Sequence, residues 1–302
     1  MELSVSIDQN QLKELLLQVG LVRPVFIWGG PGIGKSAIVE QFAAELGLPC
    51  VCLTGSQLAP EDLIGVPQIV NGTSVFCPPR CLVQKEPFCL FLDELNACSL
   101  EVQKAFYSLI LERRIGEYHL PDGSIVIGAG NRMQDNAITR QLPSALINRM
   151  VHVELRPSSR VWLEWATENG IHPYVYDYLC ARPDHLWSQP PKTEEPFSSP
   201  RSWHMLSDAL YGCGASVSAQ QLSVLVVGAA DAVREVGARE TAAQNVRFGE
   251  FQVAHDVVGH CFRGRGGERQ HGDAGEFFAQ LGDAQVRGPE VVAPLRDAVG
   301  LR

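Results

Sequence analysis

The chain has 302 residues, 45% of them hydrophobic, and a formal net charge of −9 at pH 7. This length allows a substantial core, and usual domain sizes predict roughly two domains. The acidic balance counts against a protein whose main task is to coat nucleic acid, because such proteins need a basic surface. No apolar run is long enough to span a bilayer and no signal peptide is evident, so we expect a cytoplasmic protein with reduced cysteines.

Apolar runs alternate with helical patterns along the first half of the chain. An amphipathic helix opens it, with leucines at helical spacing after Asp8, a residue type that caps helices. Helical patterns also cover residues 35–46 and 100–113. Continuous apolar runs are typical of strands buried on both faces of a parallel sheet, so we predict a doubly wound α/β domain. The runs are Val25–Trp28, Cys50–Leu53, Phe88–Leu92, Ile125–Gly128 and Val151–Val153.

The α/β pattern ends near Pro157, and purely helical patterns follow. We therefore predict a nucleotide-binding core at 1–157 and a small all-α domain at 158–223. Residues 224–302 contain no Ser, Lys, Ile, Met, Trp or Tyr, which is unusual for a packed domain. One hypothesis is that 224–302 is a divergent or out-of-frame extension rather than the rest of the helical domain. The other reading frames of the coding DNA would test it.

A phosphate-binding loop stands between the first predicted strand and helix. Residues 29–36 match Gly-x-x-x-x-Gly-Lys-Ser, a pattern in which backbone N–H groups and a helix N-terminus surround phosphates. The lysine can reach the β and γ phosphates, and the serine hydroxyl can bind Mg²⁺. The candidate nucleotide ligands are Gly29, Gly30, Pro31, Gly32, Ile33, Gly34, Lys35 and Ser36.

A second motif places two carboxylates at the end of the run Phe88–Leu92. Ligands of open α/β sheets bind at the carboxyl ends of the strands, where Asp93 and Glu94 are expected. We predict that Asp93 holds Mg²⁺ and that Glu94 polarises the water that attacks the γ-phosphate.

With these two motifs the chain resembles the AAA+ ATPases, and within them the MoxR-like group, over roughly residues 20–212. The resemblance implies a P-loop NTPase core followed by a helical lid, with ATP and Mg²⁺ as ligands. It also implies that Asn131 orients the lytic water, that Arg149 is an arginine finger, and that Arg201 reports the nucleotide state to the lid. The implied assembly is a hexameric ring that remodels client proteins, often ones linked to a von Willebrand factor A domain, in complex assembly or metal insertion.

Two inserted hairpins favour the MoxR-like group over other AAA+ branches. Residues 61–65, followed by Val75, Phe76 and Pro79, resemble the hairpin inserted in the second helix of this group. Residues 114–123 resemble its second hairpin, and the Asp122-Gly123 pair suits a tight β-turn.

Two other functions stay open. A nucleic-acid motor, either helicase-like or a restriction-type translocase, would share every nucleotide motif. A regulatory module could bind ATP without hydrolysing it, although Glu94, Asn131 and Arg149 are all present. We reject zinc at His255 and His260, which have four residues between them and lack the required Glu, and at Cys77 and Cys81, which lack a second ligand pair.

Overall fold

The computed structural model describes residues 6–135, 139–193, 195–213 and 225. Its centre is a parallel sheet of six strands in the order β1-β10-β2-β9-β6-β3, which confirms the expected P-loop AAA+ fold. Every apolar run predicted as a strand lies in this sheet. The strands are β1 (Ser6–Ile7), β2 (Val25–Trp28), β3 (Cys50–Thr54), β6 (Cys89–Asp93), β9 (Ile125–Gly130) and β10 (Val151–Leu155).

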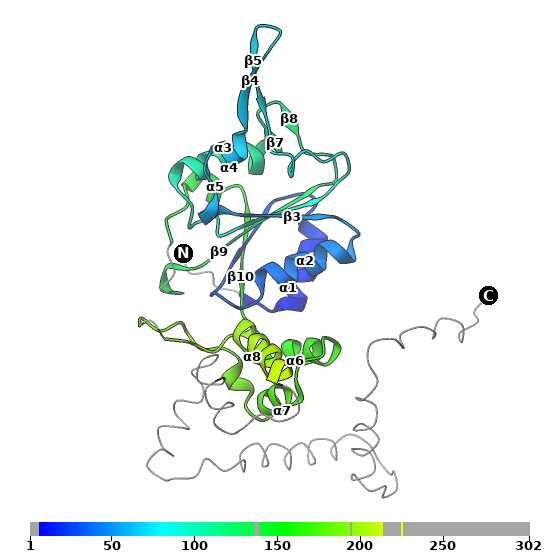
Figure 1. Cartoon of the computed structure of the whole chain (residues 1–302), viewed down its shortest axis with the longest axis vertical. Helices are drawn as coiled ribbons and strands as arrows, with labels where there is room; N and C mark the ends of the chain where they lie inside the picture. Colours follow the sequence, from blue (N-terminus) through cyan, green and yellow to red (C-terminus); the bar gives the residue numbers. More distant parts are fainter. Residues whose placement is uncertain (1–5, 136–138, 194, 214–224, 226–302) are drawn as a thin grey trace, which may run out of the picture. The chain divides into compact units, whose positions relative to one another are not determined.

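Helices cover both faces of the sheet. On one face α1 (Gln9–Val19) and α2 (Lys35–Glu45) pack on alternate strand residues such as Val25 and Ile27 (Figure 1). Asp8 caps α1 as expected, because its carboxylate accepts a hydrogen bond from the Gln11 backbone N–H at 2.9 Å. On the other face lie α3 (Glu61–Ile64), α4 (Leu100–Glu112) and α5 (Ser144–Ile147).

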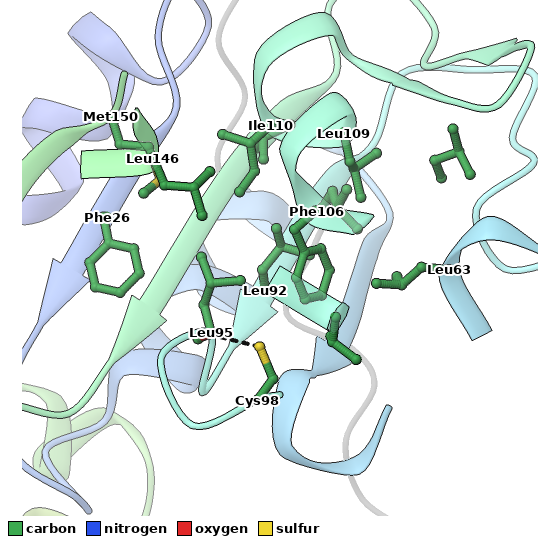
Figure 2. Close-up of a cluster of buried hydrophobic side chains, with 14 of the residues drawn as sticks. Phe26, Leu63, Leu92, Leu95, Cys98, Phe106, Leu109, Ile110, Leu146 and Met150 are labelled. Atoms are coloured by element: carbon green, nitrogen blue, oxygen red, sulfur yellow. Dashed lines mark hydrogen bonds between the residues drawn. The ribbon is translucent and has the colours of Figure 1, made fainter. Parts of the chain in front are cut away.

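The core between α4 and the sheet contains Phe26, which points to the opposite face from its neighbours Val25 and Ile27. Figure 2 shows Leu146 and Met150 beside Phe26, with Phe106, Leu109 and Ile110 of α4 along the same face. Burying each of these large side chains contributes about 1.5–3 kcal/mol. The segment that contains α5 is therefore held on the sheet largely by apolar packing.

The two predicted hairpins exist, but their bounds differ from the prediction. Residues 61–64 form the helical turn α3, and the first hairpin comprises β4 (Val66–Val70) and β5 (Thr73–Cys77). Gly65 begins this hairpin at φ +85°, and a Cβ there would lie 1.8 Å from the Cys77 carbonyl oxygen, so only glycine fits.

The second hairpin comprises β7 (Arg114–Ile115) and β8 (Tyr118–His119), and it turns at residues 116–117. The prediction of its turn at Asp122-Gly123 was wrong. That pair belongs to a separate turn, closed by the hydrogen bond from Ser124 N–H to the Pro121 carbonyl, which leads into β9. A dipeptide that favours turns does not specify which strands the turn connects.

Helices follow β10, as expected. They enclose their own apolar cluster, in which Trp162, Trp203 and Leu210 are buried. Ser158 caps the first helix and Pro173 begins the second, two residue types typical of helix starts. The helices are α6 (Ser159–Glu168), α7 (Pro173–Ala181), the 3₁₀ turn η3 (Pro183–Leu186) and α8 (Pro200–Cys213).

The domain bounds 1–157 and 158–223 stay a prediction, and residues 224–302 lie outside the described residues apart from Leu225. Among the helices that the structure describes, none is long and apolar enough to cross a bilayer. Within the same residues no cluster of three or more His, Cys, Asp or Glu side chains could hold a metal ion. The rejected pair His255 and His260 lies outside the described residues.

Candidate nucleotide-binding site

The P-loop connects the end of β2 to the start of α2, at the carboxyl end of the sheet. Gly32 and Gly34 have φ values of +75° and +93°, which residues with a Cβ rarely adopt. A Cβ on Gly32 would also lie 2.6 Å from the Ser199 hydroxyl. Gly34 precedes α2 without a capping side chain, so the first N–H groups of that helix can bind an anion.

Lys35 is buried in this loop, with 8% of its surface exposed. Its ammonium donates hydrogen bonds to the carbonyl oxygens of Gly29 (2.7 Å) and Gly30 (2.9 Å) and to Asn131 Oδ1 (2.9 Å). Burial lowers the pKa of Lys35 to about 8, although the nearby carboxylates of Asp93 and Asp135 oppose this shift. A buried cation that lacks a full counter-charge is suited to receive phosphate.

The side chains of Ser36 and Asp93 meet beside the P-loop. The Ser36 hydroxyl donates to Asp93 Oδ2 at 2.7 Å, which joins the first turn of α2 to the end of β6. Both groups offer oxygen atoms, the ligands that Mg²⁺ prefers, and Mg²⁺ normally takes its other ligands from water and substrate phosphates. The residues present therefore fit a magnesium ion that binds together with a nucleotide.

Glu94 follows directly, in the left-handed region at φ +53°. Its carboxylate accepts a short hydrogen bond from the Ser56 hydroxyl in the turn after β3, and its backbone N–H donates to Asp93 Oδ1 at 2.9 Å. The unusual backbone angle turns Glu94 away from the line of the strand. Ser56 occupies only one of the two carboxylate oxygens, so the other can still accept a proton from water.

Asn131 follows β9, and the structure adds a residue that the motif search missed. The Asn96 side chain is buried, and its amide donates to the Asn131 carbonyl oxygen at 2.7 Å. Asn96 thus holds the backbone from which Asn131 reaches Lys35. The only sequence signal is its place two residues after Glu94, a position outside the nucleotide-binding motifs of this chain.

The two predicted arginines occupy different surroundings. Arg201 lies in the first turn of α8, and its backbone N–H donates to the Gly32 carbonyl at 3.0 Å. Its guanidinium is one of the charges that act on Lys35. Both arginines are exposed, but Arg149 lies just beyond α5 and is not among those charges. The structure brings Arg201 to the P-loop and leaves Arg149 on the surface.

A cavity of about 400 Å³ adjoins the P-loop. Gly30 and Ile33 form one side of it, and Leu186 and Trp187 of the helical segment form another. The Trp187 indole N–H is buried and donates to no atom among the residues that the structure describes. Arg132, Arg156 and Asp184 also line the cavity. The volume lies in the usual range of small-molecule sites, and the mixture of apolar and polar walls suits a heteroaromatic base.

The fold and this site are similar to those of P-loop AAA domains. Residues 24–150 match the family model of the AAA domain (dynein-related subfamily). Midasin from Giardia intestinalis is 30% identical over 176 residues, which are 54% of this chain and 4% of midasin. RuvB from Synechococcus sp. (strain CC9902), a Holliday junction branch migration complex subunit, is 30% identical over 122 residues, which are 37% of this chain and 31% of RuvB.

Two solved structures are similar to this chain at lower identity. A mutant RuvB from Thermotoga maritima has a TM-score of 0.46 and 17% identity, covering 72% of this chain and 69% of that chain. NtrX from Brucella abortus, in complex with ADP, has the same TM-score and identity and covers 72% and 52% of the two chains. The chain spans less than a third of the length of the two curated relatives, midasin and RuvB.

The lowered pKa of Lys35 predicts that ATP affinity falls as the pH rises above about 8. Bound phosphates raise the pKa of Lys35, so at a pH between its pKa in the free protein and its pKa in the complex, binding takes up a proton. In that pH range the affinity should drop by up to about tenfold per pH unit. The free energy of unfolding depends on pH in the opposite direction. It is reduced below pH 8, where the buried lysine is charged, and it rises as the pH increases from 8 toward 10.5. Titration of a fluorescent nucleotide from pH 7 to 10 would measure the effect, and the same affinity at every pH would contradict it.

Replacing Gly130 by Ala should disturb Asn96 and lower both stability and turnover. A Cβ there would lie 2.3 Å from Asn96 Oδ1 and 2.9 Å from Phe26 Cζ, in a region without free space. We expect a loss of about 1–3 kcal/mol in urea unfolding and a lower kcat, because the support of Asn131 is displaced. Gly212→Ala is the control, since a Cβ at Gly212 meets no atom within 4 Å. Equal effects of the two substitutions would refute this role of Asn96.

Proposed function

We propose that this protein hydrolyses ATP and, as an oligomer of the MoxR-like type, uses the reaction to remodel client proteins. The proposal rests on two hydrogen bonds that connect the P-loop to the other motifs. Lys35 donates one to Asn131, and Ser36 donates the other to Asp93. These contacts gather a phosphate-binding cation, metal ligands and a polar amide at one end of the sheet. Such a set is what phosphoryl transfer to water requires.

In the proposed reaction the P-loop N–H groups and Lys35 hold the β and γ phosphates, while the cavity beside Trp187 takes the base. Mg²⁺, bound at Ser36 and Asp93, would neutralise charge on the phosphates. Asn131 and Glu94 position the water, and Glu94 accepts its proton on the carboxylate oxygen that Ser56 does not contact. Arg201, at the start of α8, carries the change in phosphate charge to the helical segment.

The exposure of Arg149 supports an oligomer. A guanidinium on the surface, outside its own phosphate site, can stabilise the γ-phosphate of a neighbouring subunit, and such fingers raise kcat strongly. By resemblance the assembly is a hexameric ring in the cytoplasm. The client belongs to the proteins associated with von Willebrand factor A domains, again by resemblance.

A second candidate is a motor that acts on nucleic acid. The similarity to RuvB favours it, since RuvB is a subunit of a Holliday junction branch migration complex. The net charge of −9 counts against it, because contact with many phosphates needs basic surface. ATPase assays at moderate salt with duplex DNA and four-way junctions separate the two.

The client hypothesis is tested with full-length Glu94→Gln protein, which should hold ATP without turnover. A client should be retained with ATP and released with ADP, and the purified client should stimulate the ATPase of the unmodified protein. The matched control Glu40→Gln makes the same charge change at an exposed position of α2. If DNA stimulates turnover and no protein does, the remodelling hypothesis is wrong and the nucleic-acid motor replaces it.

A further inference from the structure

One histidine bridges the P-loop strand and the segment that carries Arg149. The Trp28 indole N–H donates to His152 Nδ1 at 2.9 Å, and His152 Nε2 lies 2.8 Å from the Ile147 carbonyl oxygen. An indole N–H can only donate and a carbonyl can only accept. His152 must therefore be neutral, with its proton on Nε2, and both of its ring nitrogens are used.

The three partners stand at defined points of the chain. Trp28 is the last residue of β2 and directly precedes the P-loop residue Gly29, while Ile147 is the last residue of α5, two residues before Arg149. In the sheet His152 pairs with Phe26, so the side chains of Phe26, Trp28 and His152 share one face. The rings of Trp28 and His152 stack with centroids 6.0 Å apart.

The segment around α5 has little structure of its own. A helix of four residues, Ser144–Ile147, cannot satisfy its terminal carbonyls or persist without tertiary contacts. Apolar packing of Leu146 and Met150 beside Phe26 holds it to the sheet, as Figure 2 shows. The hydrogen bond from His152 to the Ile147 carbonyl adds a directional contact immediately before the exposed Arg149.

Burial keeps this bridge intact near neutral pH. It lowers the pKa of His152, so the neutral ring that both hydrogen bonds need is favoured. The bridge is thus a fixed polar link between two functional segments in an otherwise apolar layer.

We propose that His152 is a positioning residue that couples the P-loop strand to Arg149. Through this coupling, the nucleotide bound to one subunit orients Arg149 of the same subunit toward the nucleotide site of the next subunit. This inference rests on the proposed role of Arg149 in a neighbouring site. His152 itself touches no substrate. Its effect should therefore appear in the subunit that donates the finger and not in the subunit that hydrolyses ATP.

The test mixes two inactive full-length variants. Arg149→Ala keeps its own hydrolytic residues but lacks the finger, and Glu94→Gln keeps the finger but does not hydrolyse. Their mixture should regain ATPase activity, because fingers of Glu94→Gln subunits serve the sites of Arg149→Ala subunits. His152→Phe, which keeps a ring but loses both hydrogen bonds, is then added to either partner.

We expect His152→Phe to lower the activity of the mixture by about 10- to 100-fold when it is on the Glu94→Gln partner, since a misplaced catalytic group costs this much. On the Arg149→Ala partner it should change little, and the nucleotide KM should stay the same in both mixtures. His152→Gln, which returns a donor toward the Ile147 carbonyl, should recover part of the activity. It also keeps the test available if His152→Phe fails to fold.

Two results would overturn the inference while leaving the proposed function in place. One is an unchanged activity of the mixture when His152→Phe is on the Glu94→Gln partner. The other is an equal loss of activity whichever partner carries His152→Phe, which indicates a merely structural residue. If the parent mixture of Arg149→Ala and Glu94→Gln shows no activity, the role of Arg149 in a neighbouring site fails first and the inference fails with it.

Discussion

Replacing Glu94 by Gln is expected to lower kcat for ATP hydrolysis by about 10²–10⁴-fold while nucleotide affinity changes little. The amide cannot accept a proton from water, so the step assigned to this carboxylate is lost. Binding should survive because the substitution leaves in place the P-loop, proposed to hold the phosphates, and the proposed Mg²⁺ ligands Ser36 and Asp93. Gln can still accept a hydrogen bond from Ser56, so the local structure is retained.

Steady-state phosphate release and titration with a fluorescent nucleotide measure the two quantities separately. Glu40→Gln, at an exposed position of α2, should behave as the unmodified protein. Unchanged turnover in Glu94→Gln would favour the alternative of a regulatory module that binds ATP without hydrolysing it.

Arg149→Ala is expected to lower kcat by about 10³–10⁵-fold in the assembled protein. Arg149 is exposed just beyond α5, outside the group of charges that act on Lys35, so the removal should not weaken binding in its own P-loop. The loss arises because the γ-phosphate of the neighbouring site lacks the additional positive charge that Arg149 would supply.

The measurement is kcat as a function of protein concentration, together with the oligomeric state by light scattering. For the unmodified protein kcat should rise as subunits associate, and for Arg149→Ala it should stay low at all concentrations. Arg23→Ala removes an equally exposed charge and serves as the control. Turnover independent of concentration in the unmodified protein would contradict a shared active site.

Several contacts of the site could not be predicted from the chain. Asn96 holds the carbonyl of Asn131, 35 positions away, and Ser56 holds Glu94 across 38 positions. Nothing in the local pattern distinguishes these residues from ordinary turn residues. Their partners are fixed only when β3, β6 and β9 assemble side by side, with Thr54 opposite Asp93 and Leu92 opposite Gly128.

The second hairpin gives the same lesson for the backbone. Asp122-Gly123 has the composition of a tight turn and does form one, but β7 and β8 turn at residues 116–117. Local preferences identify where a chain bends, whereas the pairing of strands depends on what each strand packs against.

The sequence by itself determined the parallel sheet, the P-loop and the carboxylate pair. Continuous apolar runs need burial on both faces, which specifies the strands of the sheet, and the P-loop binds through backbone groups of consecutive residues. Short local stretches of the sequence therefore specify both features. Only the tertiary structure decided the burial of Lys35, the support of Asn131 by Asn96, and the bridge from Trp28 through His152 to Ile147. These depend on groups from distant segments of the chain that meet only in the folded structure, where each hydrogen bond is set by the packing around it.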